Sequence, residues 1–197
     1  MKWRGKVVSM FDPSELGSER IRRVSRAEYE RRLEQGWFVN DRIELLRGVL
    51  VEMSPQHEPH ARIAAWFAQH LSKVLAFERW DVRAHSPFAA TADSMPEPDV
   101  SVAPRGRGHH QRGALLLIEV SDSSLRKDRV IKHEIYAEAG VPEYWIVDVK
   151  RKAVEVLTQP TATGYRHVER LTTGVLRPIK LRNVSFRIID IPWRSRR

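Results

Sequence analysis

Apolar residues recur at helical spacing in three segments of the chain. Residues 26–35 predict a short amphipathic helix, which opens with the spacing of a capping box and is followed by a glycine. The segment Pro59 to Phe77 predicts a longer helix that packs one apolar face on a core. Residues 128–139 predict a third helix, in which Ile131 and Ile135 face the core.

Short apolar runs bounded by turn residues predict strands between and after these helices. The segment "RIELLRGVLVEM", residues 42–53, predicts a β-hairpin around a turn at Arg47-Gly48. The other predicted strands cover residues 81–88, 98–104, 114–121, 143–149, 153–158, 164–171 and 185–191. This order of elements predicts an α/β protein with a central mixed β-sheet flanked by helices, preceded by an N-terminal helix and the hairpin.

The composition is that of a one-domain globular protein, with 42% apolar and 30% charged residues in a chain of 197. The chain has no cysteine, which excludes disulfides, thiolate nucleophiles and thiolate metal sites. A metal ion would be held by carboxylate, imidazole or carbonyl groups, which favours Mg, Mn or Ca over structural zinc. No apolar run is long enough to span a bilayer, so we expect no membrane partner and a cytoplasmic location.

The net charge of +9 is concentrated at the two ends of the chain. Residues 1–36 carry nine basic and six acidic side chains, residues 177–197 carry seven and one, and the remainder balances. The basic ends could bind phosphates or could be solvated tails. We expect a flexible N-terminal segment over residues 1–20, one domain over residues 21–190 and a basic C-terminal tail over residues 191–197.

Two carboxylates occupy positions where a charge is unfavourable without a partner. Asp99 stands at the entry of the apolar strand "PDVSVAP", directly after a proline that stiffens the chain. Glu119 lies in "LLLIEVS", an apolar run that predicts burial on both faces. If these strands are neighbours, the two carboxylates can meet, and a hard divalent ion would relieve their repulsion. Asp99 could instead cap a turn, and Glu119 could be buried against a cation or a hydrogen-bond donor.

Lys132 places a positive charge on the third predicted helix. Asp128, Lys132 and Tyr136 recur every four residues and form a stripe beside the predicted core face. An ammonium group in this stripe could orient a water or stabilise charge on a phosphate. The alternative is an ordinary salt bridge between Asp128 and Lys132, with Tyr136 at the boundary of the core.

Four segments together resemble the Uma-two family of putative restriction endonucleases, within the PD-(D/E)XK nuclease-like superfamily. They are "DRIELLRGVLVEMSPQHEPH", "PEPDVSV", "LLLIEVSDSSL" and "KDRVIKHEIYAEAGVPEYWIVD". The resemblance implies a restriction-endonuclease-like fold in which the central sheet presents Asp99 and Glu119 to Mg or Mn. In the wider superfamily a lysine follows the glutamate by two residues, where this chain has Ser121. The resemblance implies that the following helix supplies Lys132 instead.

The same resemblance adds three candidates for the site. Glu44 matches a family glutamate before the hairpin turn, His60 matches a histidine that opens the long helix, and the Val120 carbonyl would be a further metal ligand. Glu44 could equally be a solvated strand residue, and His60 a helix cap or a packed core residue. His109 and His110 are consecutive on a Gly-rich loop and point apart, so we expect them to be loop residues.

The activity that the resemblance implies is that of a Mg- or Mn-dependent deoxyribonuclease that cleaves phosphodiester bonds of DNA, with Glu44 and His60 bordering the site. A homodimer is expected, because cutting both strands of a duplex needs two sites. The rival is a catalytically inactive protein of the same fold that binds nucleic acid or another protein. In that case the basic ends would carry DNA binding, and deleting residues 177–197 should abolish binding but leave folding intact.

Overall fold

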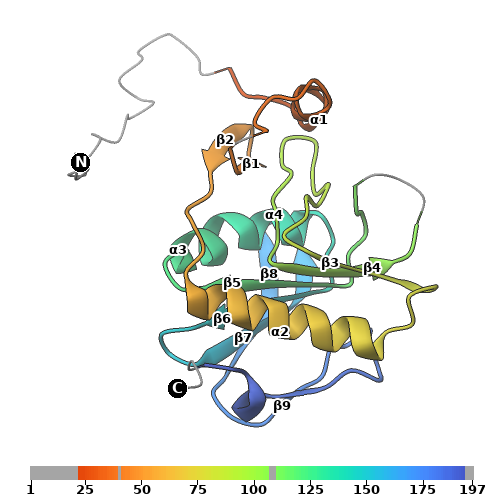
Figure 1. The fold of residues 1–197 in the computed structure, drawn as a ribbon, viewed down its shortest axis with the longest axis vertical. Helices are drawn as coiled ribbons and strands as arrows, with labels where there is room; N and C mark the ends of the chain where they lie inside the picture. Colours follow the sequence, from red (N-terminus) through yellow and green to blue (C-terminus); the bar gives the residue numbers. More distant parts are fainter. Residues whose placement is uncertain (1–21, 40, 107–109, 194–197) are drawn as a thin grey trace.

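A six-stranded mixed sheet forms the centre of the computed structural model, which describes residues 22–39, 41–106 and 110–193 (Figure 1). The strand order is β3-β4-β5-β6-β7-β8, and the mixed sheet is as predicted. β5 pairs with β6 in parallel, whereas the other neighbours in this sheet are antiparallel. The strands are β3 (Trp80–Ala84), β4 (Val100–Pro104), β5 (Leu116–Ser121), β6 (Glu143–Asp148), β7 (Ala153–Thr161) and β8 (Gly164–Leu171).

Several sequence-based expectations fall outside the described residues. They concern the N-terminal segment 1–20, His109, and residues 194–197 of the expected basic tail. The strand predicted over 81–88 ends early, at Ala84, because His85 has a φ of +46° and turns the chain out of the sheet. In the part of the chain that the structure describes, no helix is long and apolar enough to cross a membrane.

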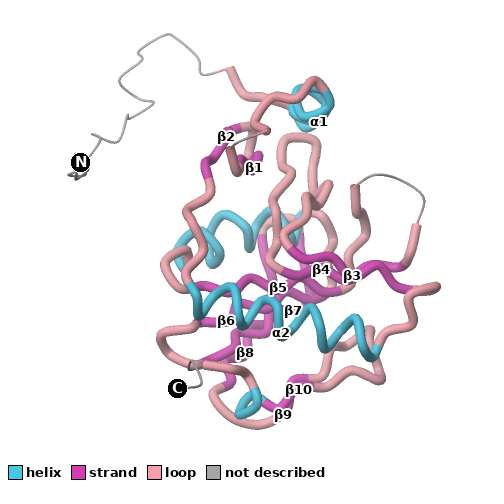
Figure 2. Tube along the Cα trace, viewed as in Figure 1, coloured by secondary structure: helices cyan, strands magenta, loops and turns pink. Residues whose placement is uncertain are grey.

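Helices cover both faces of the sheet (Figure 2). On one face lies α2 (Glu58–Val74), whose apolar stripe packs on alternate residues of β4 and β5. On the other face lies a helical segment built from α3 (Leu125–Lys127), the π-helical turn η2 (Asp128–Lys132) and α4 (His133–Glu138). Successive residues of β5 therefore face one helix layer and then the other, and Glu119 follows Leu117 toward the α4 face.

The third helical segment differs from its prediction in register. It begins at Leu125 and contains a π-helical turn, where one helix over residues 128–139 was predicted. The prediction that Ile131 faces the core is wrong, since this residue is 39% exposed. A π-turn holds more residues than an α-turn and so changes which side chains face inward. Asp128, Lys132 and Tyr136 are on the buried side, together with Ile135 and Ala137.

The C-terminal segment completes the core beneath α2. It contains β9 (Val175–Leu176), β10 (Phe186–Arg187) and the 3-10 turn η3 (Ile188–Asp190), so the strand predicted over 185–191 is wrong beyond its first residues. The turn at η3 places Phe186, Ile188 and Ile191, which are two and three positions apart, in the core. The segment buries Leu176, Leu181, Val184, Phe186, Ile188 and Ile191 in the cluster that also holds α2. Deleting residues 177–197 would remove five of these six side chains, so the structure predicts that the deletion disrupts the core, contrary to the expectation that folding survives it.

The predicted N-terminal helix and hairpin are present as α1 (Arg26–Glu34), β1 (Ile43–Leu46) and β2 (Val49–Glu52). The turn residues Arg47 and Gly48 have φ values of +51° and +78°, the left-handed geometry of a two-residue hairpin turn. The long loop between β3 and β4 docks this unit, because Leu45 and Met95 exchange backbone hydrogen bonds of 3.3 and 2.7 Å. The hairpin is thereby fixed over one end of the sheet (Figure 1).

Candidate active site

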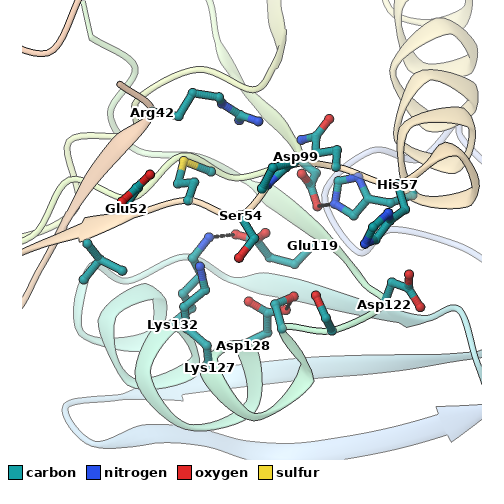
Figure 3. A pocket seen from close by; sticks show the side chains of 17 residues that line it. Arg42, Glu52, Ser54, His57, Asp99, Glu119, Asp122, Lys127, Asp128 and Lys132 are labelled. Carbon is teal, nitrogen blue, oxygen red and sulfur yellow. Dashed lines mark hydrogen bonds and ion pairs between the residues drawn. The ribbon is translucent and has the colours of Figure 1, made fainter. Parts of the chain in front are cut away.

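A pocket of about 280 Å³ lies where β5 ends (Figure 3). Its wall combines the start of α2, the chain between β2 and α2, the loop after β5, and the inner side of η2. Four of the side chains predicted for the site line this pocket: His60, Asp99, Glu119 and Lys132. The fifth, Glu44, reaches Lys132 from the hairpin at 3.1 Å. Residues from five separate segments therefore meet at one end of the sheet.

Asp99 is held at the entry of β4 by the Val120 N–H and by contacts with two histidines. Its Oδ2 accepts a hydrogen bond from the backbone N–H of Val120 at 2.7 Å and lies 3.0 Å from His60 Nε2. Its Oδ1 makes a longer contact of 3.3 Å with His85 Nδ1. Burial acts to raise the pKa of Asp99, but the contacts with the two histidines and Val120 hold it well below its usual value. Asp99 is therefore an ionised carboxylate next to β5, and it does not act as a turn cap.

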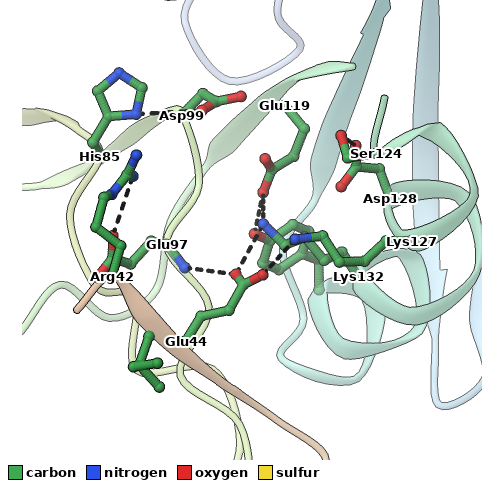
Figure 4. A network of polar contacts seen from close by, with 12 residues as sticks. Arg42, Glu44, His85, Glu97, Asp99, Glu119, Ser124, Lys127, Asp128 and Lys132 are labelled. Carbon is green, nitrogen blue, oxygen red and sulfur yellow. Dashed lines mark hydrogen bonds and ion pairs between the residues drawn. The ribbon is translucent and has the colours of Figure 1, made fainter. Parts of the chain in front are cut away.

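Lys132 lies between two carboxylates and is 1% exposed (Figure 4). Its Nζ is 2.8 Å from Glu119 Oε1 and 3.1 Å from Glu44 Oε2. Burial acts to lower the pKa of Lys132, but Glu119, Glu44 and Asp128 together hold it above its usual value. The alternative of a simple Asp128–Lys132 salt bridge is wrong, because Lys132 makes its ion pairs with the two glutamates.

Glu44 is fully buried, so the alternative of a solvated strand residue is wrong. Its Oε1 is 2.6 Å from Lys127 Nζ, and its Oε2 contacts Lys132 and accepts a long hydrogen bond of 3.4 Å from the Glu97 backbone N–H. Burial raises its pKa, but the two lysines outweigh burial and the net pKa is lowered. Glu44 is thus an ionised bridge between the hairpin and the helix that carries both lysines.

The two oxygens of Glu119 have different surroundings. Oε1 accepts hydrogen bonds from Lys132 Nζ at 2.8 Å and from the Tyr136 hydroxyl at 2.6 Å. Among the described residues, none donates a hydrogen bond to Oε2. Pairing with a lysine normally lowers the pKa of a glutamate. The pKa of Glu119 is raised instead, because burial outweighs the effect of Lys132, which Glu119 shares with Glu44. Repulsion from Asp99 and Asp128 adds to the rise. The raised pKa, about 8, favours the protonated form of Glu119, and a cation bound at Oε2 would favour the carboxylate.

Asp128 is a further buried carboxylate in the wall of the pocket. Its Oδ2 accepts hydrogen bonds of 2.6 Å from both Ser121 and Ser124, and its Oδ1 is buried without a partner among the described residues. Ser121 stands where the superfamily pattern has its lysine, so in this chain that position orients Asp128.

Tyr144 and Trp145, the aromatic residues of β6, are fully buried in the core.

Sequence reasoning missed two residues of this network. His85 falls inside a predicted strand whose alternation did not single it out, and Lys127 falls one residue before the predicted start of the third helix. Both contact residues of the site only through the tertiary fold, His85 at Asp99 and Lys127 at Glu44. The left-handed φ of His85 is a property of the folded chain and cannot be predicted from the residue type.

The chemistry of the pocket suits a hard divalent cation. In the described ranges, no group of three or more His, Asp or Glu side chains is arranged to hold a metal ion. Mg is commonly held by one or two protein carboxylates, with waters and substrate oxygens in its other positions. Asp99 and Glu119 offer two carboxylates, and the Val120 carbonyl leaves β5 on the same side as the N–H that binds Asp99. The free Glu119 Oε2 and the raised pKa of Glu119, which a bound cation would lower, fit such an ion.

Comparisons with known proteins agree with this geometry. A family model described as "Uma2: Putative restriction endonuclease" matches residues 26–182. No curated protein matches the chain. The fold is similar to the crystal structure of "a putative nuclease belonging to DUF820" from Anabaena variabilis, with a TM-score of 0.64 and 14% identity, over 78% of this chain and 92% of that one. At this identity the likeness shows the fold alone, and it confirms the restriction-endonuclease-like architecture that the sequence resemblance implied.

Proposed function

Because the chain belongs to the Uma2 family of putative restriction endonucleases, we propose that it is a divalent-cation-dependent endonuclease that hydrolyses phosphodiester bonds of DNA. The observation that carries the proposal is the convergence of Asp99, Glu119 and Lys132 at one pocket, with the lysine supplied by a helix. Restriction-endonuclease-like families generally use divalent cations, and this pocket has the oxygen donors for one.

Asp99, Glu119 and the Val120 carbonyl would hold Mg or Mn. When bound, the ion would polarise the scissile phosphate and lower the pKa of a water molecule. The chain supplies the orientation of the ligands: the Val120 N–H, His60 and His85 fix Asp99, while Lys132 and Tyr136 fix Glu119. His60 acts here as an accessory residue through its contact with Asp99.

Lys132 would act as a charged group and not as a proton acceptor. Its pKa is held above the usual value by three carboxylates, so the ammonium form persists at neutral pH. An ammonium group at this position can orient the attacking water and stabilise the charge that develops on the phosphate. Glu44 holds Lys132 from the opposite side, which keeps Nζ aimed at the pocket. Glu44 is therefore a positioning residue in this proposal.

The proposal is tested by cleavage of supercoiled and single-stranded DNA with Mg or Mn. We expect Glu119→Gln and Lys132→Met to reduce the cleavage rate by about 10²–10³-fold, the usual effect of removing a preorganised electrostatic group. Asp148→Asn is the matched control, because Asp148 is also a buried carboxylate but pairs with Arg151, outside the pocket wall. It should cleave at the wild-type rate.

Two outcomes would contradict the proposal. Equal cleavage by all four proteins would assign the activity to a contaminant. Salt-dependent DNA binding without cleavage by the wild type would favour the rival, an inactive nucleic-acid-binding protein of the same fold. A homodimer is part of the proposal, since duplex cleavage needs two sites, and sedimentation of the protein with and without DNA measures it.

A further inference from the structure

Tyr136 holds one oxygen of Glu119 and leaves the other free. Its hydroxyl donates to Oε1 at 2.6 Å, and Lys132 Nζ donates to the same atom at 2.8 Å. Both donors come from one helical segment and are four residues apart, across the junction of η2 and α4. Two donors occupy Oε1 from the helix side, so the side chain presents Oε2 to the pocket that it lines.

The hydroxyl of Tyr136 is fixed by the packing of its ring. Tyr136 is fully buried, and its ring meets Tyr144 edge-on with centroids 5.0 Å apart. On another side the ring meets Phe88, again edge-on, at 6.1 Å. A ring held by two aromatic neighbours keeps its orientation, since neither neighbour can move without opening a void. The hydrogen bond to Glu119 is therefore a preorganised contact.

We propose that Tyr136 is a positioning residue that restricts Glu119 to one-oxygen binding of a divalent cation and thereby favours Mg or Mn over Ca. The inference rests on the proposed function and names the ion selectivity of the same site. Mg requires near-octahedral geometry, whereas Ca accepts six to eight oxygens and often takes both oxygens of a carboxylate. Because Oε1 is occupied by Tyr136 and Lys132, Glu119 cannot bind an ion through both of its oxygens.

Lys132 alone does not restrict Glu119 in this way. Its ammonium group is shared with Glu44, whose Oε2 lies 3.1 Å from Nζ. Without the Tyr136 hydroxyl, Oε1 would keep one donor and gain a free lone pair, and the carboxylate could turn toward an ion with both oxygens. Removal of this single hydroxyl should therefore change the preference between ions as well as the affinity.

The experiment is calorimetric titration of Mn and of Ca into wild type, Tyr136→Phe and Tyr144→Phe, without DNA. Tyr144→Phe is the matched control, because its buried hydroxyl donates only to the Asp128 backbone carbonyl at 3.3 Å. In Tyr136→Phe we expect the Kd for Mn to rise about tenfold, the lower range for loss of a hydrogen bond to a metal ligand. The Kd for Ca should stay or fall, so the affinity ratio moves toward Ca. Tyr144→Phe should keep both constants.

The ratio of the two constants is measured within one preparation and is unaffected by any unfolded fraction. Unchanged constants in Tyr136→Phe, or equal weakening for Mn and Ca, would overturn the inference. If the wild type binds Mn and the ratio shifts as expected but no DNA is cleaved, the proposed cleavage fails and the inference stands. If the wild type binds neither ion, both the proposed function and the inference about Tyr136 are contradicted.

Discussion

Lys132, Glu119 and Glu44 form a buried charge cluster in which one ammonium group serves two carboxylates. Glu44 has a second partner in Lys127, but Glu119 has no other cation among the described residues. In a low-dielectric interior, removing one partner of an ion pair costs far more than the pair itself contributes. The cluster must therefore affect folding as well as any chemistry, and the two effects need separate measurements.

Lys132→Met should lower the free energy of unfolding by about 3 kcal/mol, because it removes the buried cation shared by Glu119 and Glu44. The double variant Lys132→Met/Glu119→Gln should recover part of this loss, since the amide needs no cation. Urea unfolding at neutral pH measures both. A single variant as stable as the wild type would show that Lys132 and Glu119 are not paired in solution.

Residue types predicted much of the candidate site but not its contacts. Burial of Glu119 followed from the apolar run around it, and Asp99 was placed beside it by the expected pairing of their strands. The position of Glu44 depends on how the loop between β3 and β4 docks the hairpin, which no local pattern encodes. Asp128 bonds to Ser121 and Ser124 and makes no hydrogen bond to Lys132, which the four-residue spacing of Asp128 and Lys132 did not predict.

At the scale of elements, the π-helical turn explains why periodicity failed in the third helix. The sequence "DRVIK" contains two adjacent apolar residues, and a regular 3.6-residue period turns one of them to the core. In the structure Val130 and Ile131 are both exposed, while the polar residues Asp128 and Lys132 are inside. The buried partners of Asp128 and Lys132 determine which face of this segment points inward, and the periodicity of apolar residues carries no information about them. The helix α2 and the strand β8 were predicted within a few residues.

Gly164 begins β8 at a close approach to α4. A Cβ at this position would lie 2.3 Å from His133 Cε1, and the residue has a φ of +149°. Gly164→Ala should therefore lower the free energy of unfolding by about 2 kcal/mol through overpacking. Gly174→Ala is the control, because Gly174 also has positive φ but open space around it, and it should cost less. Thermal unfolding compares them, and equal losses would contradict the clash.

His133 should make stability depend on pH near neutrality. Burial lowers its pKa, and its neutral Nε2 accepts a hydrogen bond of 3.2 Å from the Tyr165 backbone N–H. The unfolded chain binds the proton more readily, so this contribution is present above about pH 6.5 and is lost as pH falls through the folded pKa. Urea midpoints of wild type and His133→Gln at about pH 7.5 and about pH 5 test this. The wild type should lose more stability on acidification; parallel losses would contradict it.

At the scale of the whole molecule, the C-terminal segment belongs to the core. Truncation after Leu176 removes Leu181, Val184, Phe186, Ile188 and Ile191 from the cluster beneath α2. We expect the truncated protein to lose cooperative thermal unfolding, since each buried aliphatic or aromatic side chain contributes about 1.5–3 kcal/mol. Circular dichroism on heating checks this, and a cooperative transition near the wild-type midpoint would contradict it.

A charge variant separates DNA binding by the basic end from folding. Replacing Arg194, Arg196 and Arg197 with alanine removes three positive charges beyond the described residues and leaves the core segment intact. If this end contacts phosphates, the salt dependence of DNA binding should decrease by up to about three charges. Unfolding should match the wild type, and an unchanged salt slope would place phosphate binding elsewhere on the protein.

The parallel pairing of β5 with β6 has a consequence for where a catalytic lysine can reside. Two parallel neighbours require a crossover connection, and here that connection is the helical segment that carries Lys132 and Tyr136. Such crossovers are almost always right-handed, so chirality fixes the face on which the connecting helix lies. That helix must start from the strand end that bears Glu119. A lysine that the strand lacks can thus be supplied by the crossover without any change in chain topology.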